Sequence, residues 1–71
     1  MKYTYEVWSK DENNKPYLFD TVNTQQECAD LIGLSVNQIR ERISWRFDDS
    51  FNFWHVCRGF RYQIKKVPVN D

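Results

Sequence analysis

The stretch over residues 24–45, TQQECADLIGLSVNQIRERISW, constrains the fold most, because it predicts two short helices joined by a tight turn. Each helix is preceded by residues that fit a capping box, in which a side chain and a backbone N–H at the helix start satisfy each other: Thr24 with Glu27, and Ser35 with Gln38. Gly33 lies between the two segments, where a residue that readily takes a positive φ would end the first helix.

Apolar residues recur in both predicted helices at a helical spacing, so each helix should bury one face. In the first helix this buried face is predicted to contain Cys28, Ala29, Leu31 and Ile32. In the second helix Val36, Ile39 and Ile43 are expected to face the first, with Leu34 filling the angle at the turn.

The spacing Ala29-x3-Gly33-x5-Ile39-x3-Ile43 resembles the helix-turn-helix of phage repressors. The wider stretch FDTVNTQQECADLIGLSVNQIRERI also resembles the small DNA-binding repeat found beside the nuclease domains of homing endonucleases, and this resemblance covers roughly residues 17–66. It implies a helix-turn-helix flanked by strands, with the second helix contacting DNA. Asn23 departs from the small hydroxyl residue usual before the helix, and no nuclease sequence accompanies the motif.

Alternating patterns on either side of this stretch predict two β-hairpins within one domain, residues 1–71. The N-terminal hairpin covers residues 1–22, with strands at 2–8 and 17–22, and the helix-turn-helix covers 24–45. The C-terminal hairpin or wing covers 51–67, with strands at 51–57 and 60–66, and Val67 could extend the last strand into a tail expected to be loose. The prediction is a small α+β winged helix-turn-helix in the order β-β-α-α-β-β.

Charge and composition limit the classes of function. The 71 residues have no net charge, which argues against a non-specific nucleic-acid coat protein. Residues 1–30 carry three basic and six acidic side chains, whereas residues 31–71 carry seven basic and four acidic ones. Without an apolar run that could span a membrane or serve as a signal peptide, we expect a cytoplasmic protein with two reduced cysteines. The low alanine and glycine content hints at a phage or another AT-rich genome.

Polar side chains on the second predicted helix and basic ones near it are the candidate DNA contacts. Amide side chains can pair with adenine and arginine can pair with guanine in the major groove, mainly near the start of a recognition helix. We therefore expect Ser35, Asn37, Gln38 and Arg40 at bases or the nearest phosphates, Arg42 and Arg46 on the DNA backbone, and Arg58 and Arg61 as wing contacts. Lys65 and Lys66 are weaker candidates, and Glu41 would repel phosphate.

Other kinds of site have less support in the sequence. His55 is the only histidine and has no nucleophile placed beside it by a motif, so we do not expect an enzyme. With Cys28 and Cys57 it offers three metal ligands at most, so neither a metal nor a cofactor is expected. The three tryptophans could close the edges of the core, form a protein interface, or stack on single-stranded bases: Trp8, Trp45 and Trp54.

The sequence thus favours a duplex-DNA-binding regulator of transcription from a phage or mobile element. One copy offers few phosphate contacts, so tight binding would require a homodimer or a partner chain. The alternative is a small inhibitor or adaptor, of the phage counter-defence type, that binds a host protein through an aromatic surface.

Overall fold

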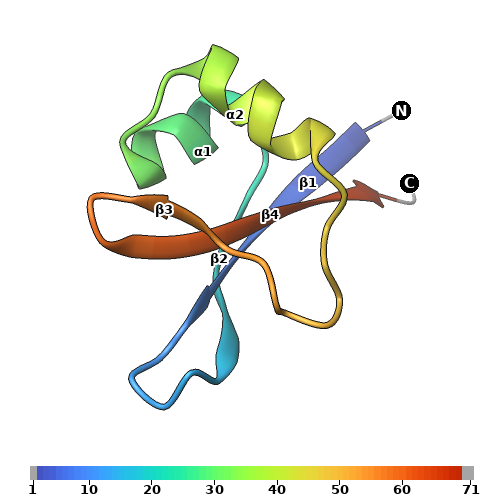
Figure 1. The fold of residues 1–71 in the computed structure, drawn as a ribbon. Helices are drawn as coiled ribbons and strands as arrows, with labels where there is room; N and C mark the ends of the chain where they lie inside the picture. Colours follow the sequence, from blue (N-terminus) through green and yellow to red (C-terminus); the bar gives the residue numbers. More distant parts are fainter. Residues whose placement is uncertain (1, 70–71) are drawn as a thin grey trace.

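The computed structural model describes residues 2–69, which form two hairpins on either side of a pair of helices (Figure 1). The elements follow the predicted order: β1 (Lys2–Lys10), β2 (Pro16–Val22), α1 (Gln25–Ile32), α2 (Val36–Ser44), β3 (His55–Cys57) and β4 (Phe60–Val69). The strands make one antiparallel sheet in the order β2-β1-β4-β3. The α+β class is therefore confirmed.

β4 joins the two hairpins, because its two parts pair with different strands. Its first part pairs with β3, ending at the pair His55↔Tyr62. Its second part pairs with β1, from Trp8↔Gln63 to Lys2↔Val69. Only β3 and the first residues of β4 therefore extend beyond the sheet built on β1, as the left side of Figure 1 shows.

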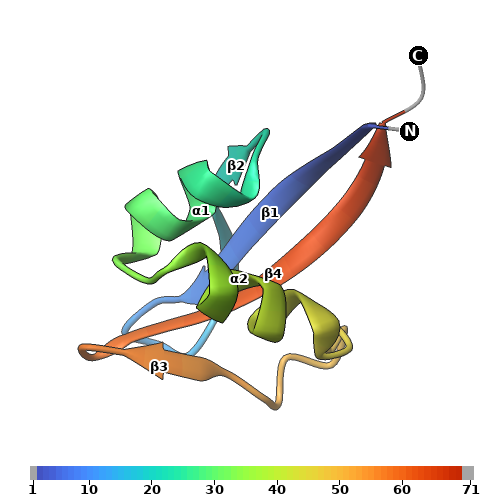
Figure 2. The ribbon, with the colours of Figure 1, turned by 90° about the horizontal axis from the view of Figure 1, so that it is seen from above.

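The helices cover one face of the sheet, here called the helical face. α1 lies over β1 and β2, and α2 lies over β4 (Figure 2). Alternate residues of β1 and β4 point into this layer, which confirms the period of two read from the sequence. The buried core consists of Tyr5, Val7, Val22, Cys28, Ala29, Ile39, Tyr62 and Ile64, with Ile32, Leu34, Val36 and Ile43 packed against it.

Leu31 does not belong to this core, so its predicted place on the buried face of the first helix is wrong. A helix turns by about 100° per residue, so Leu31 lies about 200° around the axis from Ala29. The sheet contacts the other side of this short helix, where Cys28 and Ala29 are buried and Ile32 is half-buried.

The helix ends follow the predicted signals with one difference. The Thr24 hydroxyl accepts the Glu27 N–H at 3.0 Å and donates to the Glu27 carboxylate at 3.2 Å. A complete capping box needs the Glu27 carboxylate to accept the Thr24 backbone N–H, but here this carboxylate bonds to the Thr24 hydroxyl. Only half of the predicted capping box at α1 is therefore formed. Gly33 has φ 89° and donates its N–H to the Ala29 carbonyl, which ends α1 as expected.

The strand predicted over residues 51–57 is shorter, and β3 begins only at His55. Residues 46–54, here called the crossing loop, are irregular because the Asp48 carboxylate accepts the N–H groups of Ser50, Asn52 and Phe53 at 2.8–3.0 Å. Such side-chain bonds compete with strand pairing for the same backbone donors. The last strand is longer than predicted and reaches Val69, while residues 70 and 71 of the expected loose tail lie outside the described residues.

The crossing loop covers part of the sheet's other face, here called the back face. Phe47 and Phe51 lie against Trp8, with ring centroids 6.3 and 5.5 Å away, and Trp54 stacks on Phe51 at 5.9 Å. Buried Gln63 fixes the loop: its carbonyl accepts the Asp48 N–H at 2.9 Å, and its amide donates to the Asp48 carbonyl at 3.2 Å. Trp8 and Trp54 are thus half-buried beneath or within this loop, whereas Trp45 is exposed.

Candidate nucleic-acid interface

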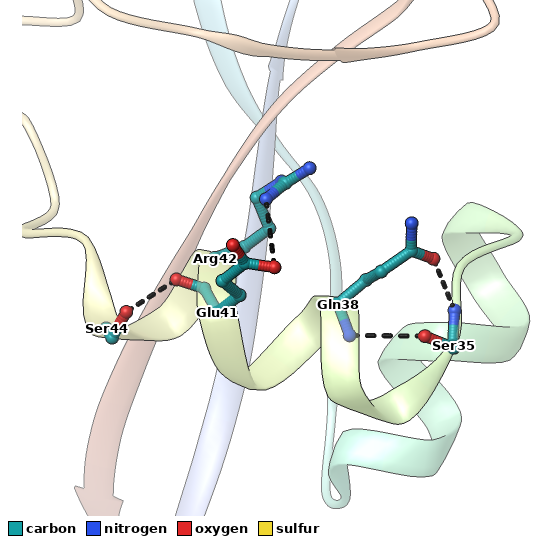
Figure 3. A network of polar contacts seen from close by, with 5 residues as sticks. All are labelled: Ser35, Gln38, Glu41, Arg42 and Ser44. Carbon is teal, nitrogen blue, oxygen red and sulfur yellow. Dashed lines mark hydrogen bonds and ion pairs between the residues drawn. The ribbon is translucent and has the colours of Figure 1, made fainter.

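The N-terminus of α2 is held by a reciprocal capping box (Figure 3). The Ser35 hydroxyl accepts the Gln38 N–H at 3.2 Å, and the Gln38 side-chain carbonyl accepts the Ser35 N–H at 3.0 Å. Both side chains are exposed. A bidentate contact to adenine uses the amide oxygen and nitrogen together, so Gln38 can make it only if this capping bond breaks. In the capped state Gln38 still offers its amide N–H groups, and Ser35 its hydroxyl proton.

Asn37 and Arg40 lie on the exposed side of α2. The Arg40 Nε donates to the Gln25 side-chain carbonyl at 3.3 Å, a bond that links the two helices. It directs Arg40 toward the first turn of α1, and Asn37 lies one turn closer to the N-terminus of α2. These two residues, with the free donors of the capping box, form the polar surface at the start of the helix.

Arg42 lies between α2 and the second hairpin. Its side chain is half-buried and its Nη1 is 3.9 Å from the Glu41 carboxylate (Figure 3). Burial lowers the pKa of His55, and the charge of Arg42 lowers it further. Burial raises the pKa of Tyr62, although the nearby Arg42 guanidinium acts in the opposite direction. The structure thus places Arg42 against aromatic residues of β3 and β4, apart from the polar surface at the start of α2.

The hairpin tip brings Arg58 to the turn between the helices. Arg58 and Gly59 both have positive φ, 51° and 82°, as a two-residue hairpin turn requires. The Arg58 Nη1 lies 3.9 Å from the position that a Cβ on Gly33 would take, and the Cys57 thiol donates to the Ile32 carbonyl at 3.8 Å. The guanidinium therefore lies beside the C-terminus of α1, where a cation is favourable, at the turn that leads into α2.

Arg61 is placed on the other side of the sheet. It is exposed and directly precedes the buried Tyr62 in the alternation of β4, so its side chain belongs to the back face. Its carbonyl accepts the hydroxyl of the buried Ser9 at 2.7 Å. The two wing residues expected from the sequence thus separate, and only Arg58 lies near α2.

A second group of cations surrounds the C-terminus of α2. A hollow of about 310 Å³ is lined by Arg46, Lys65 and Lys66 together with the acidic Asp49. The Lys65 ammonium lies 5.4 Å from the ring centre of Phe47, and the Lys66 ammonium lies 4.1 Å from that of Tyr3. The packing of α2 and the crossing loop on β4 brings these lysines to Arg46, so their association has no signal in the local sequence.

The remaining reactive groups lie in packed surroundings. His55 contacts three aromatic rings, those of Phe53, Tyr62 and Trp45, at centroid distances of 4.9, 5.4 and 6.1 Å. Burial, with smaller effects from nearby acidic groups, raises the pKa of Cys28 to about 11. Within residues 2–69, no three His, Cys, Asp or Glu side chains gather as a metal site, and no helix is long and apolar enough to cross a membrane.

Comparison with known proteins leaves the chain without an assigned family. No protein-family model matches it, and neither a curated protein nor a solved structure does. The class that the fold defines is a small α+β domain with a four-stranded antiparallel sheet and two helices on one face.

Proposed function

We propose that this protein binds duplex DNA as a winged helix-turn-helix regulator and presents α2 to the major groove. The observation that carries the proposal is the position of Arg58 against the Gly33 turn. It puts a guanidinium at the turn that leads into α2, and the capped N-terminus of α2 has backbone N–H groups and a helix dipole that favour an anion. A phosphate at this corner would meet both.

The exposed residues of α2 divide into two roles in this proposal. Asn37 and Arg40 face the base edges, since they lie in the first turns of the helix and carry side chains suited to adenine and guanine. Ser35 and Gln38 donate to phosphate or to a base acceptor while their capping bonds persist. Glu41 is exposed in the middle of this face and favours an orientation in which the N-terminal half of α2 is the deeper.

Cations at both ends of α2 match the width of the groove. The nine residues of α2 span roughly 13 Å, and the major groove of B-DNA is about 12 Å wide. Arg58 at one end and Arg46 at the other could then reach phosphates on either side. A single copy supplies few such contacts, so the proposal includes a second copy or a partner chain for tight binding.

The test is fluorescence anisotropy of a labelled random-sequence duplex at about 50 and about 200 mM salt. Binding should weaken steeply with salt, and Arg58→Ala should reduce the slope of log K against log salt by about one, as expected for one lost phosphate contact. Lys15→Ala is the matched control, because it removes one exposed cation from the tip of the other hairpin. The absence of binding at the lower salt, at tens of micromolar protein, would refute the proposal.

The alternative, an inhibitor or adaptor of a host protein, is favoured by the outer edge of the sheet. β2 is an edge strand whose Tyr17, Leu18 and Phe19 are exposed. Such an edge can accept a strand from another protein. In this case Leu18→Lys should abolish binding to the partner found by pull-down, whereas Arg58→Ala should leave that binding unchanged.

A further inference from the structure

Two aromatic side chains form an exposed, nearly parallel pair beside the C-terminus of α2. The rings of Trp45 and Phe53 are 8° from parallel with centroids 5.7 Å apart, and the residues are 57% and 44% exposed. His55 contacts both rings edge-on, at interplanar angles of 82° and 89°. Here His55 supports the two rings from the side, so each ring keeps part of its surface open to solvent.

This pair is held by contacts outside the rings themselves. Trp45 ends α2 and donates its N–H to the Arg42 carbonyl at 3.2 Å. Phe53 donates its N–H to the Asp48 carboxylate at 3.0 Å, and Asp48 is in turn fixed to the sheet by Gln63. The two aromatic residues are therefore positioned without a ligand, and a ligand that stacks on them would not need to order them.

The hollow beside Trp45 has the charge that a phosphate requires. Trp45 lines it together with Arg46, Lys65 and Lys66, against a single carboxylate from Asp49. The net charge of these lining groups is thus positive, although the whole chain is neutral. A π surface and a basic hollow meet at Trp45, and this combination matches the chemistry of a nucleotide, in which an aromatic base is joined to a phosphate.

We infer that Trp45, Phe53 and the adjoining basic hollow form a binding site for single-stranded nucleic acid. An unpaired base stacks on the exposed aromatic surface, and the neighbouring phosphate lies near Arg46, Lys65 and Lys66. Stacking of this kind tolerates any base, because every base has a π face. The inference goes beyond duplex binding and does not depend on it, since the duplex site is centred on the opposite end of α2 and shares only Arg46 with this one.

The inference is tested by anisotropy of labelled oligo(dT) and oligo(rU), each about 12 nucleotides long, at about 50 mM salt. Both should bind, and Trp45→Ala should weaken binding roughly 5- to 150-fold, the range that loss of one stacked base produces. Trp45→Phe should restore most of the affinity. Tyr17→Ala is the matched control, because Tyr17 is 42% exposed on the far edge of the sheet. Circular dichroism of each variant checks the fold.

The outcomes separate this site from the proposed duplex site. Binding of oligo(dT) alone or of oligo(rU) alone supports the site and identifies its ligand as DNA or RNA. Failure of both oligonucleotides to bind overturns the inference, even if the duplex binds. Equal weakening by Trp45→Ala and Tyr17→Ala overturns it as well, because the binding would then be non-specific. Binding of oligonucleotides without binding of duplex supports this site and refutes the duplex proposal alone.

Discussion

Removal of the Gln63 side chain should release the crossing loop and destabilise the whole domain. Gln63 is only 3% exposed, and its amide makes two hydrogen bonds to the Asp48 backbone, at 2.9 and 3.2 Å. Each neutral hydrogen bond contributes about 0.5–1.5 kcal/mol, so Gln63→Ala should cost about 1–3 kcal/mol. A chain of this length has a total stability of roughly 4–10 kcal/mol, so the loss is a large fraction of it.

The assays are urea denaturation and a thermal melt, each followed by tryptophan fluorescence and by circular dichroism. For a domain of this size, a loss of about 2 kcal/mol should lower Tm by roughly 8–16 °C. Gln26→Ala is the matched control: it removes the same side chain from an exposed position, where Gln26 donates to Asp30 at 3.0 Å. That exposed pair should contribute at most about 0.5 kcal/mol.

A local measurement checks the same mechanism. The N–H groups of Ser50, Asn52 and Phe53 are bonded to the Asp48 carboxylate, so they should exchange with solvent faster when Gln63 no longer holds Asp48. If Gln63→Ala costs no more than Gln26→Ala and leaves this exchange unchanged, the reasoning is refuted, and the aromatic contacts alone hold the loop.

Three further predictions concern single groups. Cys28 is buried with a pKa raised to about 11, so the native protein should expose only the Cys57 thiol to a disulfide reagent near pH 8, and urea should expose both. Burial holds the pKa of His55 below its usual 6.5, so the contribution of this residue to stability should be fully present above pH 6.5 and should be lost as the pH falls from 6.5 through the lowered pKa. His55→Gln should remove this part of the pH dependence in urea titrations. Gly33→Ala should lower the free energy of unfolding by about 1–2 kcal/mol in urea denaturation, because an alanine is strained at a φ of 89°. The cost should stay at this backbone strain, because the nearest atom lies 3.9 Å from the added Cβ; an unchanged midpoint would show that the turn relaxes.

The parts of the fold that could be predicted are those with a local physical signal. The alternation in β1, the capping residues Thr24 and Ser35, and the glycine at the end of α1 each act within a few residues of chain. The buried position of Ile39 follows from the helical period alone. Such signals are readable because the residues that satisfy them are neighbours in sequence.

The errors arise where distant residues decide the structure. Residues 51–54 alternate like a strand, but hydrogen bonds to Asp48, which Gln63 fixes from another strand, keep them out of the sheet. For the candidate site, the exposure of Asn37 and Arg40 followed from helix geometry. The position of Arg58 at the Gly33 turn, and the meeting of Arg46 with Lys65 and Lys66, depend on contacts between segments distant in sequence that no local pattern encodes.

The pairing of Lys2 with Val69 has a consequence for engineering. Because β1 and β4 are neighbours, the two ends of the described chain lie side by side (Figure 2). A short linker could join them, and the chain could be opened in the exposed turn over residues 11–15, so that a circularly permuted protein would keep every strand pair of the sheet. By the same geometry, the domain could be inserted into a surface loop of a carrier protein without forcing the carrier's ends apart.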